Sequence, residues 1–285
     1  MTAAAPGVSL PTTSRTYEVY AVEYGRLAST KEELFYRYSA YGEPDEPVEM
    51  SYYLWVLKHD GDAVVVDTGF DRVVGERRGR TCLVDPIAAL ASIGVDPASV
   101  KTVVVTHLHY DHIGNLHAFP NAEFVVPLRE LEFWTSPVAR AAQFAAHVEE
   151  AEIGFLQRAS AKGRVRTTAG TESILDGVTA IEAGGHSAGQ QLTVIDGVGG
   201  GVVLASDAVH FYEELELERP FAVMHDLERM YLAYEKLKSF ARAGAVVVPG
   251  HDPDVVRRHR STGHGAMGVV RLDAPRAGST HMEGT

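Results

Sequence analysis

Short runs of β-branched and other apolar residues, separated by polar and turn-forming residues, recur along most of the chain. Runs of four to seven residues of this kind predict β-strands. The predicted strands lie at residues 16–22, 51–57, 63–67, 102–106, 123–126, 178–181, 191–195, 202–205 and 245–248. Nine strands indicate a large sheet system.

Helical segments separate several of these strands. Asp85 as N-cap and Pro86 at the first helical position predict a helix that Gly94 ends. Further helices are predicted at residues 127–136, 136–160 and 226–243. The last carries an apolar stripe at helical spacing, which predicts packing against a core rather than a cofactor site. The stripe consists of Leu227, Met230, Tyr231, Tyr234, Leu237 and Phe240. Strands interleaved with helices favour one compact α/β domain.

Two stretches fit no regular element. Residues 22–50 mix Gly and Pro with aromatic residues, and a long loop of this kind typically serves binding, here as a dimer surface or a lid over a site. Residues 71–83 carry four arginines, which predict a solvated loop, with contact to a substrate carboxylate as the alternative. These are Arg72, Arg77, Arg78 and Arg80. The composition of the two ends predicts a flexible N-terminus at 1–15, a single domain at 16–260 and a flexible C-terminal tail at 261–285.

Composition and charge narrow the class of protein. A hydrophobic share of 45% in 285 residues excludes a disordered tail protein. The formal charge is −12, from 26 basic and 38 acidic residues, and no basic run is present, so we expect no nucleic-acid partner. No apolar run is long enough for a membrane helix, and no secretory leader pattern opens the chain, which predicts a soluble, cytoplasmic protein. The lone Cys82 excludes a disulfide framework and a thiolate-rich metal site.

The predicted strand at 102–106 runs directly into the segment THLHYDHIGN, which holds three of the 13 histidines. At a strand end His107 and His109 project to the same side, because side chains alternate with a period of two. Asp111 and His112 follow where the chain turns and face another point. Imidazole and carboxylate are zinc-type ligands, so two such pairs predict two metals. A ligand-free loop is disfavoured, since three imidazoles and a carboxylate are costly to desolvate together.

Three more ligand-type residues end or follow predicted strands. His186 lies in the glycine-flanked turn GGHSAG, Asp207 follows the strand at 202–205, and His251 follows the strand at 245–248 through Pro-Gly. Each alone is typical of an ordinary turn residue. Together they can converge on one sheet edge and complete a dinuclear site.

These motifs resemble the metallo-β-lactamase fold superfamily, and within it the N-acyl homoserine lactonase branch. The resemblance covers residues 50–255 and rests on THLHYDHIGN, VDTG at 66–69, GGHSAGQQ at 184–191, SDA at 206–208 and PGHD at 249–252. It implies a four-layered αββα sandwich, in which two mixed sheets pack face to face with helices outside. It also implies a ligand assignment. His107, His109 and His186 would hold one metal, Asp111, His112 and His251 the other, Asp207 would bridge them, and Asp67 would support the ligand loop.

The site predicts hydrolysis of an acyl bond. Two divalent cations can share a water, lower its pKa toward about 7 and polarise a carbonyl; Zn²⁺ is the expected ion, and Fe, Mn or Co would also suit these ligands. The resemblance implies a quorum-quenching lactonase that opens a lactone such as an N-acyl homoserine lactone by attack of the bridging hydroxide. Asp111 would pass a proton to the leaving group.

One position departs from the resembled lactonases. They carry a Tyr three residues after the bridging Asp, whereas this chain has His210. We predict that His210 contacts the substrate carbonyl, with simple packing as the alternative. Tyr110, Phe211 and Tyr212 are predicted to form the wall of the substrate pocket.

Other interpretations remain at this stage. The substrate could be another cyclic ester, an ester or an amide met in small-molecule catabolism. A non-catalytic binding module is the alternative from another class, although no ligand is missing. A redox di-iron module is disfavoured, because that branch typically has Glu where this chain has His109. The sequence leaves a homodimer open.

Overall fold

The computed structural model describes residues 15–197, 200–262 and 268–274, which form two mixed β-sheets with helices outside them. The first sheet has the strand order β13-β14-β1-β2-β3-β5-β6-β7, with β4 paired to β1, and the second has the order β12-β11-β10-β9-β8. Strands β3, β5, β6 and β7 run parallel, as do β11 and β12, and the other pairs are antiparallel.

The strands have the following bounds. In the first sheet they are β1 (Glu18–Thr30), β2 (Pro47–His59), β3 (Asp62–Val66), β4 (Thr81–Cys82), β5 (Thr102–Val104), β6 (Glu123–Pro127), β7 (Val165–Thr168), β13 (Arg260–Ser261) and β14 (Val269–Arg271). In the second they are β8 (Thr171–Leu175), β9 (Val178–Glu182), β10 (Gln191–Ile195), β11 (Val202–Ser206) and β12 (Val246–Pro249).

The α-helices and the shorter 3₁₀ turns connect these strands. The α-helices are α1 (Lys31–Leu34), α2 (Arg72–Arg77), α3 (Pro86–Leu90), α4 (Tyr110–Ile113), α5 (Leu128–Trp134), α6 (Ala142–Ala145), α7 (Glu150–Ala161), α8 (Tyr212–Leu217), α9 (Leu227–Arg242) and α10 (Asp254–Arg258). The 3₁₀ turns are η1 (Tyr38–Tyr41), η2 (Ala91–Ile93), η3 (Leu116–Ala118) and η4 (Pro137–Arg140).

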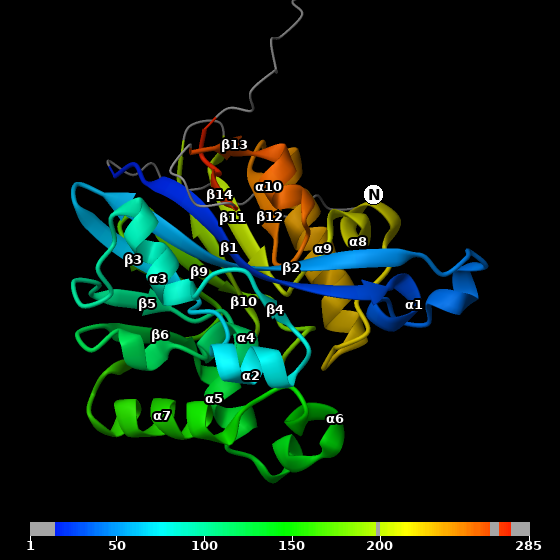
Figure 1. Ribbon diagram of the computed structural model, residues 1–285, viewed down its shortest axis with the longest axis horizontal. Coiled ribbons are helices and arrows are strands. Elements are labelled where there is room, and N and C mark those ends of the chain that lie inside the picture. Colours follow the sequence, from blue (N-terminus) through cyan, green and yellow to red (C-terminus); the bar gives the residue numbers. More distant parts are fainter. Residues whose placement is uncertain (1–14, 198–199, 263–267, 275–285) are drawn as a thin grey trace, which may run out of the picture.

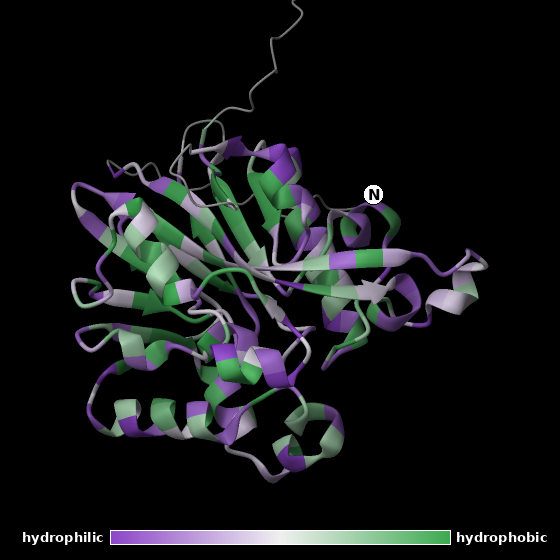
Figure 2. Ribbon diagram, in the orientation of Figure 1, coloured by the Kyte–Doolittle hydropathy of each residue, from purple (hydrophilic) through white to green (hydrophobic). Residues whose placement is uncertain are grey.

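Alternation along the buried strands divides the core into layers. Val64 and Val66 face the second sheet, whereas Val65 faces the helices outside the first, because successive strand residues point to opposite faces. Helices α3, α5 and α7 pack on that outer face, and α9 packs on the outer face of the second sheet. Figure 2 shows that hydrophobic residues are concentrated on the strands. The predicted four-layered αββα sandwich is confirmed.

All nine predicted strands are present, but the irregular stretch at 22–50 was wrongly predicted. Strand β1 continues to Thr30 and β2 begins at Pro47, so both ends of this stretch belong to a long antiparallel pair that extends to α1 (Figure 1), and α1 and η1 lie between them. Aromatic residues of this pair and of nearby loops form a buried cluster of their own. It includes Tyr24, Phe35, Tyr38, Tyr52, Phe70, Tyr110, Phe211 and Phe221.

Other boundaries also differ from the prediction. The single helix expected at 136–160 is broken into η4, α6 and α7, since the backbone is extended at Ala141 and the His147 carbonyl accepts a hydrogen bond from Tyr110 N. Residues 71–83 form α2, which Asp71 caps, and β4. In α9, Met230, Tyr234, Leu237 and Phe240 are buried as expected, while Leu227 and Tyr231 are exposed.

The predicted flexible ends lie largely outside the described residues. Within the predicted C-terminal tail, however, β14 pairs with β1, and Val269 and Leu272 are buried. Every helix in the described ranges is too short or too polar to cross a membrane.

Gly114 follows α4 at a close approach of two backbone segments. A Cβ at this position would lie 2.4 Å from Asp71 N and 2.8 Å from Gly69 O. We expect Gly114→Ala to lower the free energy of unfolding by about 1–3 kcal/mol, because backbone cannot yield as a side chain can. Urea denaturation measures this change.

Gly154→Ala in α7 is the matched control. Its Cβ would meet only the Arg158 side chain, at 3.2 Å. Alanine is the better helix former, so stability should stay equal or rise by up to about 1 kcal/mol. Equal losses in the two variants would contradict the packing argument.

Candidate metal centre

The THLHYDHIGN segment carries ligand-type side chains from the end of β5 into α4. Strand β5 ends at Val104, so His107 and His109 lie in the following loop rather than in the strand, as the alternation argument assumed. Their rings are nevertheless neighbours, with centroids 4.5 Å apart. Asp111 and His112 lie in α4.

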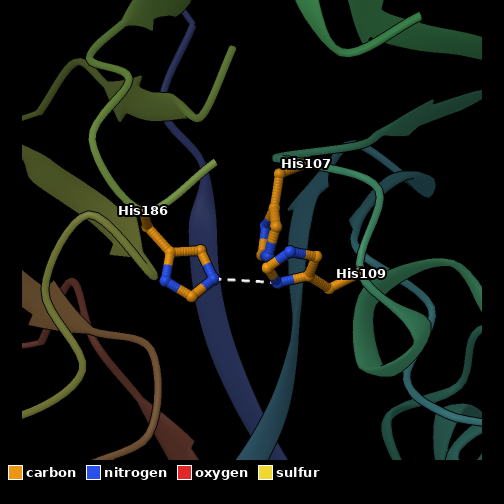
Figure 3. Close-up of side chains that lie close together, drawn as sticks. All are labelled: His107, His109 and His186. Carbon is orange, nitrogen blue, oxygen red and sulfur yellow. Dashed lines mark hydrogen bonds between the residues drawn. The ribbon is translucent and has the colours of Figure 1, made fainter. Parts of the chain in front are cut away.

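The second sheet supplies the other side of the cluster. His186 lies between β9 and β10, Asp207 directly follows β11, and His251 lies two residues beyond β12. Figure 3 shows His186 facing His109, with His186 Nε2 2.9 Å from His109 Nδ1. Residues that are far apart in sequence thus meet where strands of both sheets end.

Asp207 lies at the centre of this cluster. Its carboxylate oxygens lie 3.1 Å from Nε2 of His251, 3.2 Å from those of His112 and His210, 3.4 Å from that of His186 and 3.9 Å from that of His107. Two sets of three potential ligands flank it, and the ligand atoms of each set lie within 4.8 Å of one another. One set is His107, His109 and His186; the other is Asp111, His112 and His251. The structure therefore brings together all seven residues that were predicted as ligands, and His210 joins His186 and Asp207 in a further group of the same kind.

The outward nitrogens of three of these histidines are hydrogen-bonded. Nδ1 of His112 lies 2.7 Å from an Asp67 oxygen, that of His186 3.0 Å from the Val223 carbonyl, and that of His251 2.8 Å from the Ser51 carbonyl. A carbonyl can only accept, so His186 and His251 carry their proton on Nδ1 when neutral. Their Nε2 lone pairs then point into the cluster, as metal ligation requires.

Burial and charge set the protonation of the cluster in this structure. Burial, reinforced by neighbouring histidines, holds the pKa values of His107, His109 and His186 well below the usual value, although Asp207 opposes this. Burial would raise the pKa of Asp207, but the surrounding histidines outweigh it and lower that pKa. Burial would lower the pKa of His112, but Asp207, Asp111 and Asp67 outweigh burial and raise that pKa well above its usual value, so a cation bound there would displace a proton.

A buried polar atom without a partner supports a metal site. Nε2 of His107 is buried, makes no hydrogen bond and lies 3.9 Å from the Asp207 carboxylate. An orphaned buried nitrogen is costly unless something else satisfies it. The buried His and Asp clusters are consistent with a dinuclear metal site.

Asp67 makes hydrogen bonds to the segment that carries the predicted ligands. Its carboxylate accepts hydrogen bonds from Thr106 N and Thr106 Oγ1, both at 2.8 Å, in addition to its contact with His112. It holds a φ of 59°, in the left-handed region where only a few non-glycine residues lie. Asn115, the last residue of the motif, donates from its amide to the carbonyls of Thr68, Gly69 and Phe70 and so fixes the Asp67 turn against α4.

Glu130 in α5 is a supporting residue that the sequence did not reveal. One oxygen accepts from Leu108 N at 3.0 Å and Trp134 Nε1 at 2.9 Å, and the other from Ser187 Oγ at 2.7 Å and Gly189 N at 2.6 Å. The fully buried carboxylate therefore joins the loop of His107 and His109 to the turn of His186. A lone Glu in a helical segment gives no sequence signal for this role.

A cleft of about 130 Å³ opens onto the cluster. His109, Asp111, His186 and Asp207 form its base, and Tyr110 lines it as predicted. Arg80 and His147 also line it, so the expectation of a solvated loop was wrong for Arg80, and His147 was missed. The rest of the lining is mainly apolar and consists of Leu27, Leu34, Met50, Tyr52, Phe221 and Val223. Glu33 also lines the cleft and is exposed.

Three residues that were predicted to contact the substrate are not among the described residues that line the cleft. His210 is fully buried, stacks on Phe221 at 3.7 Å and lies between Asp207 and Glu214, so contact with a substrate carbonyl would require the ring to move. Burial would lower its pKa, but these two carboxylates outweigh burial and raise it to about 9. Phe211 packs in the aromatic cluster, and Tyr212 packs against Arg258, with the guanidinium 3.8 Å from its ring. Neither is part of the cleft wall.

A sequence profile of the Metallo-beta-lactamase superfamily matches residues 48–251, most of the chain. The chain belongs to the metallo-β-lactamase superfamily. It is 32% identical over 181 residues to the N-acyl homoserine lactonase AttM of Azorhizobium caulinodans, a match that covers 59% of this chain and 64% of that relative. It is 26% identical to an N-acyl homoserine lactonase of Bacillus sp. over 73% of this chain and 84% of the relative.

Solved structures share the superfamily fold. A quorum-quenching N-acyl homoserine lactone lactonase superposes with a TM-score of 0.73 at 22% identity, over 88% of this chain and 98% of that one. AidC, described as a dizinc quorum-quenching lactonase, superposes with a TM-score of 0.65 at 17% identity, over 93% of this chain and 99% of that one. At these identities the likeness establishes the fold of the superfamily.

Removing the Glu130 carboxylate tests its supporting role. We expect Glu130→Ala to lower the free energy of unfolding by about 3 kcal/mol or more, because several buried donors lose their acceptor at once. Glu130→Gln should cost less, since one acceptor oxygen remains. Urea denaturation of the protein measures both.

Glu132→Ala on the same helix is the control. Glu132 is exposed, so the change should stay within about 0.5 kcal/mol. If Glu130→Ala behaved like Glu132→Ala, the four hydrogen bonds would carry no net stability.

Proposed function

We propose that this chain is a dinuclear metal-dependent hydrolase that opens a lactone ring, of an N-acyl homoserine lactone or a similar compound. The observation that carries the proposal is the central position of Asp207 between two sets of buried ligand-type side chains. A carboxylate in that position can offer one oxygen to each of two cations.

The two cations would be held by the seven residues brought together around Asp207. The donor set of imidazoles and carboxylates fits Zn²⁺, and Fe, Mn or Co would also suit it. When bound, two such ions lower the pKa of a shared water and polarise an acyl carbonyl.

The chain's own residues have distinct roles in this proposal. Asp111, which lines the cleft, would take the proton of the attacking hydroxide and pass it to the departing alkoxide of the opened ring. Tyr110 beside it packs against the substrate. His210 positions Asp207 rather than touching the substrate, because its Nε2 lies 3.2 Å from that carboxylate and its ring is fully buried.

The choice of a lactone rests on the relatives. Those named above are N-acyl homoserine lactonases, and the cleft is small with a partly apolar wall, which would suit a compact ring and an acyl chain. Another cyclic ester, an ester or an amide remains the alternative substrate.

Metal content tests the dinuclear site. Protein purified gently and analysed by inductively coupled plasma mass spectrometry should hold about two equivalents of metal. His109→Ala and Asp207→Ala should each lose at least one equivalent and, on the order of a hundred-fold or more, turnover. His117→Ala, which removes an exposed histidine of the same segment, should change neither.

If Asp207→Ala kept its metal content and its turnover, the proposal would be contradicted. Wild-type protein that binds fewer than about one and a half equivalents and turns over nothing would favour a binding module instead.

Substrate class is tested on the metal-loaded protein. Homoserine lactones of varied acyl length, a γ-lactone and an aryl ester should be compared by the release of acid at constant pH. We expect the lactones to give the highest kcat/KM. A preference for the aryl ester, with no homoserine lactone turned over, would exclude the signalling role and leave a general esterase.

A further inference from the structure

Arg80 is a cation in the wall of the candidate active-site cleft. It lies between α2 and β4 and lines the same cleft as His109, Tyr110 and Asp111. Among the described residues that form the cleft, it alone carries a permanent positive charge. Its place therefore bears on which substrates the cleft can select.

The guanidinium is held in one position by its neighbours. Its Nε donates to Tyr110 Oη at 2.8 Å and to Tyr52 Oη at 3.1 Å, and one terminal nitrogen donates to the Arg78 carbonyl. Tyr52 is fully buried. A side chain fixed in this way loses little further freedom when a ligand binds.

The charge of Arg80 has no counter-ion in contact with it in the described part of the chain, and Asp111 of the same cleft acts on it only from beyond contact distance. No carboxylate of a described residue lies within 4.0 Å of its nitrogens, whereas the neighbouring Arg77 and Arg78 contact Glu149 at 2.6 and 2.7 Å. Its second terminal nitrogen makes no hydrogen bond to a described residue. A partly buried cation without a counter-ion is unfavourable, which makes sense where a ligand supplies the anion.

Local charge would matter to an anionic ligand of this protein. The formal charge of the chain is −12, and the rim of the cleft carries Glu33, whose carboxylate accepts from Ser29 Oγ. The long-range field thus repels anions, but it is screened beyond roughly 8–10 Å. At closer range the free terminal nitrogen of Arg80 can donate a charge-assisted hydrogen bond to a carboxylate.

We propose that Arg80 recognises a carboxylate on the substrate, on the part of the molecule away from the bond that is cleaved. Of two lactones or esters on the same scaffold, the member with a carboxylate substituent is then preferred over the neutral one. This inference rests on the proposed hydrolase function and adds a substrate class to it.

A matched pair of substrates tests the proposal. One is a γ-lactone with a carboxylate substituent, and the other is the same lactone with a carboxamide in its place. Wild-type, metal-loaded enzyme should favour the anionic member in kcat/KM. Arg80→Gln should lower the ratio of the two kcat/KM values on the order of ten-fold or more, and Arg80→Lys should lower it less.

Arg77→Gln is the control for the loss of a neighbouring positive charge. Arg77 is exposed and contacts Glu149, so the ratio should be that of the wild type. If Arg80→Gln lowered both kcat/KM values equally, Arg80 would only support Tyr110, and the proposal would be overturned. Wild-type preference for the carboxamide would overturn it as well.

Binding of the ring-opened products separates this inference from the proposed function. Their affinities for the metal-loaded protein can be measured by calorimetry without turnover. Arg80→Gln should weaken the product with the extra carboxylate on the order of ten-fold relative to the carboxamide product. If the protein showed this loss of affinity but no turnover, the proposed hydrolase function would be rejected and the anion site would stand. If Arg80→Gln weakened both products equally, the anion site would be rejected.

Discussion

The buried carboxylate of Asp207 is the constraint on which the rest of the centre depends. Five imidazole nitrogens lie within 4.0 Å of it, and they come from loops that follow strands of both sheets. Placing an ionised group there is costly unless every neighbour compensates it. The hydrogen bonds that the histidines make to Asp67, Ser51 and Val223 orient their rings so that they do. A buried ionised group surrounded by compensating neighbours is typical of a functional site rather than of a structural core.

The sequence was a good guide wherever a local pattern determined the outcome. Short apolar runs located nine strands, and ligands that end or follow strands were brought together because strand ends meet at one edge. Alternation failed at His107 and His109, since β5 ends at Val104, yet their rings still lie side by side.

The missed features depend on contacts between distant parts of the chain. The break within 136–160 accompanies a hydrogen bond between His147 and Tyr110, which no helical periodicity can show. Glu130 and Arg80 owe their roles to partners far away in sequence. His210 was predicted to contact the substrate because the resembled lactonases carry a tyrosine at this position. In the structure its ring lies between the carboxylates of Asp207 and Glu214. Ligand positions follow from local motifs, whereas the wall of the cleft follows from packing.

The hydrogen bonds that join the two sheets at the centre have a consequence for ion uptake. Glu130 connects the loop after β5 to the turn before β10, and the backbones of Ser51 and His251 bond each other at 2.8 Å. The scaffold is thus assembled by the chain itself, and the entropy of gathering the donors is lost during folding rather than on loading. The rate at which an ion is captured should then be governed by its passage through the cleft and by the loss of its hydration shell.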